Sequence, residues 1–443
     1  MACRKFLFLQ GAATPFFSKL AAAVRQLGHE AYRINFCGGD TLLSPSPRNW
    51  RFSQPLHVLP DWLEAKHRQH GFTDALVFGD TRPVHVDAIK TLRRLGVRIH
   101  VFEEGYLRPN WITLEQDGVN GYSSLLNRPA EFWQIPEREL AEAQETRLTG
   151  RTFGVRALYD IGYRLANGLL KPLYPHYHTH RPVNALFEYA GWAIRLPYIK
   201  LLRNLLDQRN IQGLIHTQTP YYLLPLQLDS DAQIRVHSPF DSVEHSMLEV
   251  MTSFAQHAPT NSKLVIKNHP LATGLLDHED QAADIAAALG ISDRVIFLES
   301  GNLPELLENT RGTVLVNSTT GTSALYHGSP TCVLGTAIFN LPGLTFQHGL
   351  DRFWQEGEAP DRTLYRHFRL QVIRHTQVNG DLYTRQGIKL AVAGSLQRMG
   401  VAPVAVPAKD PAIVATTTVT SEFLPIPSYG GSLPEKSYLY KKR

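Results

Sequence analysis

Cysteine is scarce in this chain, and its scarcity excludes two classes of protein. Only three cysteines occur among the 443 residues, at Cys3, Cys37 and Cys332. They are too few and too far apart to form a disulfide framework or a cysteine-rich zinc site. A reducing compartment, the cytoplasm, is therefore the expected location.

The sequence also lacks long apolar runs. No continuous stretch reaches the roughly 18 apolar residues that a transmembrane helix needs. The apolar run at the N-terminus is short and leads into a glycine turn, as a first strand would, so no signal peptide is expected. The net charge of +5 favours anionic partners such as nucleotides, nucleic acid or an acidic membrane surface, although a weakly basic soluble protein would show the same balance.

Short apolar runs alternate with amphipathic stretches, which predicts an α/β fold. The runs at 5–11, 74–80 and 98–104 each end in small or polar residues, and a helical pattern at 86–96 separates the last two. Continuous apolar strands joined by helices are typical of a parallel, doubly wound sheet. We expect this first Rossmann-like domain to span residues 1–133.

A second series of this kind runs from GLIHTQ (213–218) to PTCVLG (330–335). It predicts a second Rossmann-like domain over 211–400, and two such domains facing a cleft form a GT-B-like arrangement. The intervening residues 134–210 read as a helical bridging region. Their basic and aromatic groups suit an anionic membrane interface, but helices with a buried apolar face fit equally well. Residues 401–443 are rich in Pro, Thr, Ser and Ala and are expected to form a disordered tail.

Charged residues follow the predicted strands of the first domain. Ligands of open α/β sheets bind beyond the carboxyl ends of the strands, so these residues are candidates for a site. Glu103 and Glu104 end one strand, and adjacent strand residues point to opposite sides, so one of the pair should face the cleft; we favour Glu104. Solubilising charges at a strand end are the competing interpretation. Substrate-binding candidates near these strand ends are Asp80, Arg82, Tyr106 and Arg108.

In the second domain, the segment PLQLDSD places Gln227, Asp229 and Asp231 after an apolar strand. The two aspartates could hold a divalent cation on a nucleotide diphosphate, supply a nucleophile, or lie in a solvated turn. Their spacing does not decide among these possibilities.

Two further turns of the second domain suit an anion. KNHP contributes Lys267, His269 and Pro270, and a histidine and a lysine at a strand end can clamp a phosphate. The hydroxyl-rich turn before a short helix offers hydroxyls and N–H groups, although simple helix capping is common. Its residues are Asn317, Ser318, Thr319 and Thr320.

Several motifs, taken in order, resemble a known family. GHEAYRINFCGGD, FGDTRPVH, FEEGYLRPNW, PLQLDSD, KNHP and VNSTTGTSAL are similar to those of KpsS/LipB-type capsule polysaccharide synthesis proteins, which are retaining β-Kdo glycosyltransferases. The resemblance covers roughly residues 1–400.

The resemblance implies a reaction. The donor would be CMP-β-Kdo, the acceptor the glycerol of a (lyso)phosphatidylglycerol, and the product the first residue of a poly-Kdo linker. The protein would be cytoplasmic and peripheral on the inner membrane, and its partners would be other capsule synthesis and export proteins, with no nucleic acid and no cofactor. There are two alternatives: a glycosyltransferase of polysaccharide synthesis that uses another nucleotide sugar as donor, or a protein with a non-catalytic role in capsule assembly or export.

The resemblance also implies roles for residues. His269, Pro270, Ser318 and Thr319 would hold CMP. Asp229, with Gln227, would supply the nucleophile, and Glu103 or Glu104 across the cleft would activate the acceptor hydroxyl. Arg82, Arg108 or Lys267 would face the carboxylate of Kdo. A nucleoside monophosphate donor lacks the diphosphate that an aspartate-bound cation usually bridges, so we expect no metal.

Overall fold

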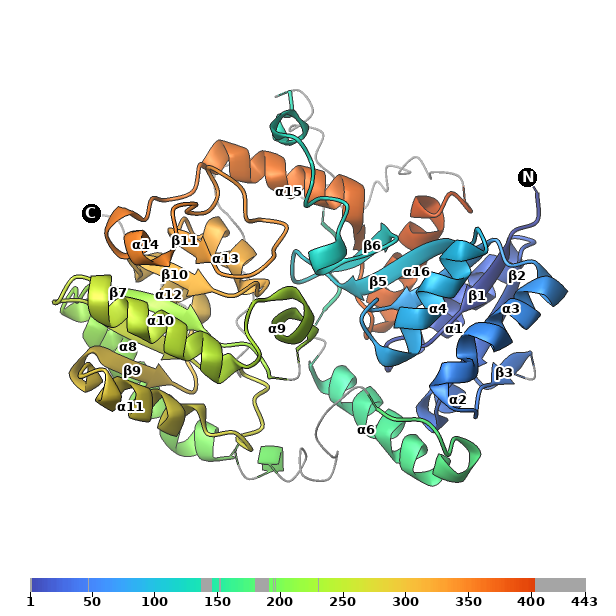
Figure 1. Ribbon diagram of the computed structural model, residues 1–443, viewed down its shortest axis with the longest axis horizontal. Helices are drawn as coiled ribbons and strands as arrows, with labels where there is room; N and C mark the ends of the chain where they lie inside the picture. Colours follow the sequence, from blue (N-terminus) through green and yellow to red (C-terminus); the bar gives the residue numbers. More distant parts are fainter. Residues whose placement is uncertain are drawn as a thin grey trace, which may run out of the picture.

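The computed structural model describes residues 2–46, 48–136, 146–150, 153–179, 191–193, 195, 197–229 and 231–402. These residues form two lobes, each built on its own sheet (Figure 1). The α/β class and the two Rossmann-like units predicted from the sequence are confirmed. The predicted tail and parts of the bridging region lie outside the described residues.

The first lobe contains a seven-stranded sheet in the order β12-β6-β5-β4-β1-β2-β3. From β3 to β5 the neighbouring strands pair in parallel, whereas β6 pairs antiparallel with both β5 and β12. The strands are β1 (Lys5–Phe8), β2 (Glu30–Asn35), β3 (Asn49–Arg51), β4 (Asp74–Phe78), β5 (Arg98–Glu104), β6 (Trp111–Gln116) and β12 (Gln377–Asn379).

Helices cover both faces of this sheet. Along β1, Phe6 and Phe8 pack on one face against α1 and α16, while Leu7 and Leu9 pack on the other against α3 and α4. This alternation is the two-residue period of a strand buried on both sides. The helices are α1 (Phe16–Gln26), α2 (Gly38–Leu43), α3 (Leu59–His70), α4 (Pro83–Arg94) and α16 (Arg385–Arg398), with the 3₁₀ turns η1 (Leu56–Val58), η2 (Asn120–Tyr122) and η3 (Ala130–Trp133).

The second lobe contains a five-stranded sheet of parallel strands, in the order β11-β10-β7-β8-β9. Its strands are β7 (Tyr221–Pro225), β8 (Lys263–Lys267), β9 (Val295–Leu298), β10 (Gly312–Leu315) and β11 (Thr331–Val333). Its helices are α8 (Asn204–His216), α9 (Ala232–His237), α10 (Val243–His257), α11 (His278–Ala288), α12 (Leu303–Asn309), α13 (Thr320–Tyr326) and α14 (Leu350–Glu356), with the 3₁₀ turn η6 (Ser292–Arg294).

One predicted strand is wrong. The run 213–218 is not a strand, because its first residues form the end of α8. Ile211 and Leu214, three residues apart on that helix, pack into the same core as Tyr221 and Leu223 of β7. The apolar run therefore belongs to a buried helix face, a pattern that cannot be told from a short strand by periodicity alone.

The chain returns to the first lobe at its end. The helix α15 (Arg362–Thr376) leads to β12 and α16, which join the first sheet and its helical layer (Figure 1). Residues 377–400, which the sequence assigned to the second domain, therefore pack in the first lobe. The pairing of a three-residue strand with a partner more than 250 residues away leaves no local pattern to detect.

Part of the bridging region packs on the first lobe as α6 (Phe153–Leu169), followed by the turn η4 (Lys171–Leu173). A Cβ atom on Gly38 would lie 2.1 Å from the Ala166 carbonyl oxygen, so α2 approaches α6 closely because it starts with glycines. A π-helical turn, η5 (Ile199–Arg203), leads into α8. Among the described residues, no helix is long and apolar enough to cross a membrane.

Candidate functional site

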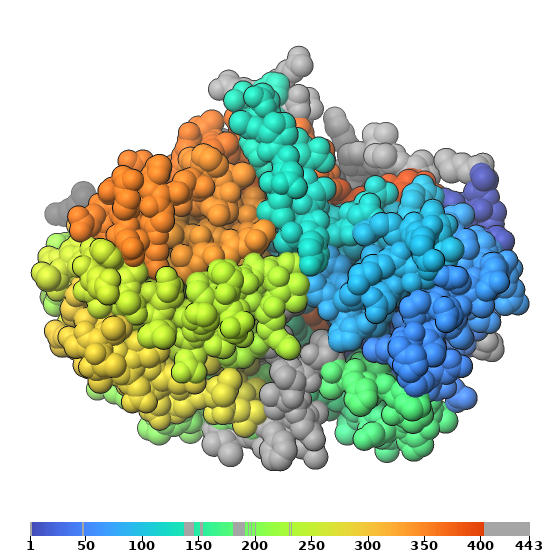
Figure 2. Space-filling view, in the orientation of Figure 1, coloured from blue at the N-terminus to red at the C-terminus, as the bar shows by residue number. Residues whose placement is uncertain are grey.

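The site lies where the two lobes face each other. In Figure 2 the segment that includes η2 meets the yellow-green segment of α9, and these two elements are in contact. A second contact joins the lobes at Thr322, whose hydroxyl donates to the Tyr106 carbonyl oxygen at 3.3 Å. The turn after β5 therefore lies against the start of α13.

The two glutamates that end β5 point to opposite faces of the sheet. A Cβ atom on Gly79, near the start of α4, would lie 3.3 Å from Glu103 Oε2. Glu104 instead accepts a short hydrogen bond from the Tyr383 hydroxyl, near the start of α16. This is the alternation expected of adjacent strand residues.

The two carboxyls have different proton affinities. Burial raises the pKa of Glu103 to about 7, although a hydrogen bond from the Glu104 N–H and the charges of Arg82 and Arg108 oppose the rise. Burial also acts on Glu104, but the charges of Arg156 and Arg108 and the Tyr383 hydroxyl outweigh it and hold the pKa of this carboxyl below its usual value. Glu104 is thus a fixed anion, whereas Glu103 exchanges its proton near neutral pH.

The Glu104 carboxylate forms an ion pair with a residue of α6. Arg156 Nη1 lies 3.5 Å from Glu104 Oε1, and the guanidinium lies over the Tyr383 ring at 5.2 Å. Neither Arg156 nor Tyr383 was predicted from the sequence. No local motif marks them, because they are far from Glu104 in sequence and reach it from two separate helical segments.

Two of the predicted substrate-binding residues use their polar atoms within the protein. Asp80 Oδ2 accepts a hydrogen bond from the Val119 N–H at 2.9 Å. The buried Tyr106 hydroxyl donates to Glu115 at 2.8 Å and accepts from the Asn120 N–H at 2.6 Å. Both side chains therefore stabilise the rim of the first lobe, and their contact with a substrate stays a prediction.

The two arginines predicted to bind substrate differ in their hydrogen-bond partners and in their surroundings. Arg82 Nη1 donates to the Gly11 carbonyl at 2.9 Å, and its guanidinium lies over the Phe78 ring at 5.0 Å. Arg108 is exposed, and its Nε donates to the Gly105 carbonyl at 3.1 Å. Burial raises the pKa values of Glu103 and Asp231, and the positive charge of Arg108 opposes the rise; this charge acts on three carboxyls, from both lobes, and on one histidine. These groups are Glu103, Glu104, Asp231 and His269.

In the second lobe, two buried amides tie neighbouring loops together. Gln227 Nε2 donates to Asn317 Oδ1 at 3.1 Å, and the Asn317 N–H donates back to Gln227 Oε1 at 3.3 Å. Asn317 Nδ2 also donates to the carbonyls of Gln233 and His237. These residues fix the ends of β7 and β10 relative to α9, and their contact with a donor stays a prediction.

The two aspartates after β7 have different partners. Asp231 caps α9, and its Oδ1 accepts from the Gln233 N–H at 3.0 Å. Asp229 is more exposed, and its Oδ2 lies 3.0 Å from Nε2 of His278. Burial lowers the pKa of His278, but its hydrogen bonds to Asp229 and Gln281 outweigh burial and raise it overall. His278 was not predicted from the sequence, where it stands 49 residues from its partner.

His269 is a neutral hydrogen-bond donor. Burial lowers its pKa to about 4, and the charges of Lys267, Arg108 and Arg156 add to the effect. Its Nδ1 accepts from the Leu271 N–H at 3.1 Å, so the proton of the neutral ring lies on Nε2. Lys267 is buried beside it, and Pro270 is exposed.

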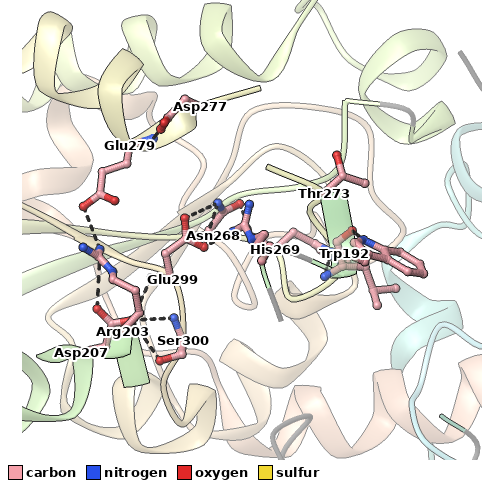
Figure 3. A network of polar contacts seen from close by, with 12 residues as sticks. Trp192, Arg203, Asp207, Asn268, His269, Thr273, Asp277, Glu279, Glu299 and Ser300 are labelled. Atoms are coloured by element: carbon pink, nitrogen blue, oxygen red, sulfur yellow. Dashed lines mark hydrogen bonds and ion pairs between the residues drawn. The ribbon is translucent and has the colours of Figure 1, made fainter. Parts of the chain in front are cut away.

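A buried network holds the loop that carries His269 (Figure 3). The His269 N–H donates to Asn268 Oδ1, and Asn268 Nδ2 donates to both oxygens of Glu299. The N–H groups of Glu299 and Ser300 donate to Asp207 of α8, at 3.0 and 2.8 Å. The rigid anchoring of this loop therefore depends on a carboxylate from the start of α8.

The hydroxyl-rich turn before α13 lies at the same edge of the sheet. Ser318 Oγ donates to Thr320 Oγ1 at 3.1 Å and accepts from the Thr320 N–H at 3.1 Å. Ser318, Thr319 and Thr320 are half-buried, so their oxygens remain within reach of a ligand. In the part of the chain that the structure describes, no group of three or more His, Cys, Asp or Glu residues could hold a metal ion.

Comparison with known proteins identifies the family. Residues 73–383 match the family described as capsule polysaccharide biosynthesis protein. The chain belongs to this family. It is 35% identical to the capsule polysaccharide export protein KpsS of Escherichia coli over 382 residues, which cover 86% of this chain and 97% of KpsS. It is 33% identical to the capsule polysaccharide modification protein LipB of Neisseria meningitidis serogroup A, over 86% of this chain and 91% of LipB. The resemblance seen in the motifs is confirmed.

Among solved structures, this capsule protein is similar to the β-Kdo 2,7 transferase of Thermosulfurimonas dismutans KpsC, with a TM-score of 0.42 and 13% identity over 89% of this chain and 99% of that one. It is also similar to Anabaena HepE in complex with UDP and glucose, with a TM-score of 0.33 and 10% identity over 90% of this chain and 100% of that one.

Proposed function

We propose that this protein transfers Kdo from CMP-β-Kdo to the glycerol of a (lyso)phosphatidylglycerol, with retention of the anomeric configuration. The product is the first residue of the poly-Kdo linker of a capsular polysaccharide. The observation that carries the proposal is the exposed Arg108, which follows the turn whose Tyr106 carbonyl accepts a hydrogen bond from Thr322 of the second lobe. A cation there suits a sugar that carries its own carboxylate.

The proposed reaction has two displacements. In the first, a carboxylate oxygen of Asp229 attacks the anomeric carbon of Kdo, the bond from that carbon to the phosphate oxygen breaks, and CMP leaves. In the second, a glutamate takes the proton of the glycerol hydroxyl, the hydroxyl oxygen attacks the same carbon, and the bond to Asp229 breaks. We assign the first role to Asp229, because Asp231 is engaged as the cap of α9.

The proton affinities of the two glutamates indicate which one is the base. A general base works best when its pKa lies near the working pH. The pKa of Glu103 is about 7, whereas Glu104 is held as an anion by Arg156 and Tyr383. We therefore assign proton transfer to Glu103, in place of the Glu104 favoured from sequence, and give Glu104 the role of positioning Arg156.

The remaining residues bind the leaving group. The Nε2–H of neutral His269 donates a hydrogen bond to the phosphate of CMP, and Lys267 supplies positive charge. The hydroxyls of Ser318, Thr319 and Thr320 provide further donors. Preorganised donors of this kind stabilise a leaving phosphate without a metal ion.

The proposal is tested by incubating the purified protein with enzymes that generate CMP-Kdo and a fluorescent phosphatidylglycerol. The expected product is a lipid with one added Kdo, formed equally well when EDTA is added after CMP-Kdo has been generated and before the protein and the lipid. A lipid modified only when UDP-sugars are supplied would favour a different donor. Loss of the product on adding EDTA would return the Asp229–Asp231 segment to consideration as a cation site.

A non-catalytic role in export is the second candidate, because the Escherichia coli relative is named a capsule polysaccharide export protein. In that case Asp229→Asn would leave capsule production intact in cells. Our proposal expects Asp229→Asn to abolish the capsule while the protein still folds and binds CMP. It also places the protein on the cytoplasmic side of the inner membrane, next to other capsule synthesis and export proteins.

A further inference from the structure

A buried histidine holds one oxygen of the proposed nucleophile. Nε2 of His278 lies 3.0 Å from Oδ2 of Asp229, and within the described part of the chain no hydrogen bond reaches Oδ1. The side chain of His278 is 4% exposed, and that of Asp229 is 32% exposed. The ring thus fixes one oxygen of a half-exposed carboxylate and leaves the other oxygen open to a substrate.

The partners of His278 suit a ring that carries a positive charge. Its Nδ1 lies 2.9 Å from Oε1 of Gln281, whose Nε2 donates to Glu244 at 3.2 Å. The bond to Glu244 decides which end of the Gln281 amide faces the ring, because a carboxylate only accepts hydrogen bonds. Both ring nitrogens of His278 therefore face acceptor oxygens, and an imidazolium, with a proton on each nitrogen, satisfies both.

The charges around the ring favour the same state. Burial lowers the pKa of His278, but the hydrogen bonds to Asp229 and Gln281 and the negative charge of Asp229 outweigh burial and raise the pKa overall. The positive charge of Arg195 opposes this rise, and Arg195 is itself paired with Glu299. The folded protein therefore favours a charged ring beside the Asp229 carboxylate.

The pair is not needed to cap a helix. His278 is the first residue of α11, but the N–H groups of Glu279 and Asp280 already donate to Asp277, at 3.1 Å each. The start of α11 is therefore satisfied without any contact to Asp229. What the contact fixes is the segment that follows β7.

The same loop serves the proposed leaving group and the proposed nucleophile. β7 and β8 are neighbours in the sheet, with Pro225 opposite Lys267. Asp229 follows β7, whereas His269 and His278 lie near the two ends of the loop between β8 and α11. This loop therefore carries the proposed phosphate donor near its start and the partner of Asp229 at its end.

We propose that His278 is a positioning residue for the transfer reaction: as an imidazolium it holds Oδ2 of Asp229, so that Oδ1 is the atom that bonds to the anomeric carbon. This role rests on the proposed function, whereas the charge of the ring does not.

His278 keeps both of its protons throughout the proposed reaction. In the first displacement Oδ1 supplies the electron pair of the new bond, and the electron pair of the breaking bond leaves with the phosphate oxygen of CMP. Oδ2 becomes the carbonyl oxygen of the ester and still accepts from the Nε2–H of His278. In the second displacement the Asp229 carboxylate is released beside the imidazolium, whose charge-assisted hydrogen bond stabilises it.

The test measures kcat and KM for CMP-Kdo with the full chain and a soluble lysophosphatidylglycerol acceptor. His278→Gln keeps a hydrogen-bond donor but loses the charge, so we expect kcat to fall about 10- to 100-fold, with KM and the affinity for CMP within about twofold of the wild type. The matched control is His327→Gln, because the His327 side chain is also buried, at 8% exposed, and lies 3.0 Å from the carboxylate of Glu308. This control should leave kcat unchanged, and circular dichroism confirms that each variant folds.

NMR of the histidine ring nitrogens, in protein without donor, tests the charge separately from the reaction. We expect one ring to titrate above about 6.5, the ordinary value of histidine, to titrate lower in Asp229→Asn and to be absent from His278→Gln. This measurement on the wild type and Asp229→Asn holds even if His278→Gln does not fold.

Three results would overturn the proposal. An active wild type whose kcat is kept in His278→Gln would leave the pair a structural contact. A fall in kcat with an equal loss of CMP affinity would show that the variant disturbs the whole loop. A wild type in which no ring titrates higher than in Asp229→Asn would mean that no imidazolium stands beside Asp229. A wild type that transfers no Kdo, although this ring titrates as expected, would instead overturn the proposed function and leave a structural ion pair.

Discussion

Arg156 of α6 forms an ion pair with Glu104 at the end of β5, with 3.5 Å between Nη1 and Oε1. The pair joins a helix from the bridging region to the acidic strand end of the first lobe. The two adjacent glutamates differ in pKa: burial raises that of Glu103, whereas at Glu104 the charges of Arg156 and Arg108 outweigh burial and lower it.

The first prediction concerns the base. Transfer should increase as the pH rises through about 7, because Glu103 must lose its proton to act, and burial raises its pKa to about 7. Glu103→Gln should lower the rate at least about 100-fold and remove this pH limb. The measurement is kcat/KM between pH 5.5 and 9. A profile that is flat from pH 6 to 8 would instead point to Glu104, whose pKa is lowered.

The second prediction concerns Arg156. Its removal in Arg156→Ala takes away the largest charge that keeps Glu104 ionised, so the pKa of Glu104 should rise. We expect kcat to fall about tenfold with a soluble lysophosphatidylglycerol acceptor, by the loss of about 1.4 kcal/mol of positioning energy. The control is Arg68→Ala, an exposed arginine of α3. Unchanged kinetics in Arg156→Ala would show that the ion pair serves only folding.

The third prediction concerns the pair of Asp229 and His278. Folding raises the pKa of His278, so the pair stabilises the folded state below pH about 6.5, the ordinary value for histidine, and this stabilisation is lost as the pH rises through the folded-state pKa. His278→Gln should lower the free energy of unfolding by about 1 kcal/mol more at pH 6 than at pH 9. Urea unfolding at the two values measures the difference. An equal loss of unfolding free energy at both pH values would show that the effect comes from packing and not from the charge of His278.

The fourth prediction concerns the network behind His269. Asp207 is fully buried and accepts hydrogen bonds from two backbone N–H groups and the Ser300 hydroxyl. Asp207→Ala leaves these donors unsatisfied and should lower the free energy of unfolding by about 3 kcal/mol. It should also weaken CMP binding, measured by calorimetry, because the loop that carries His269 loses its anchor. Asp241→Ala, at an exposed position, is the control and should change neither quantity.

The sequence was enough to predict much of the fold. Runs such as 99–102 and 264–267 are buried in strands that pair in parallel with at least one neighbour, so their apolar pattern is local. The return of β12 to the first sheet could not be predicted, because strand pairing over such a distance depends on the whole fold. The strand predicted at 213–218 is wrong for a related reason: a short apolar run alone does not distinguish a strand from a buried helix face.

The roles of individual side chains were harder to predict than their location. Tyr106, Gln227 and Asn317 lie at the site as expected, but their polar atoms are used by buried hydrogen bonds within the protein. Arg156 and His278, which pair with the two key carboxylates, lie on helices with no recognisable motif. Only tertiary packing brings these partners together, so composition and spacing carry no sign of them.

The central claim is that Asp229 forms a covalent bond to the sugar. The direct measurement is mass spectrometry of the Glu103→Gln variant after incubation with CMP-Kdo alone, since this variant should complete the first displacement and stall before the second. The account predicts an added mass of one Kdo on the peptide that contains Asp229, retained in a further Asp231→Asn variant and lost in Asp229→Asn. Product formed by the wild type with no adduct in any variant, or an adduct that is lost with Asp231 and kept without Asp229, would contradict it.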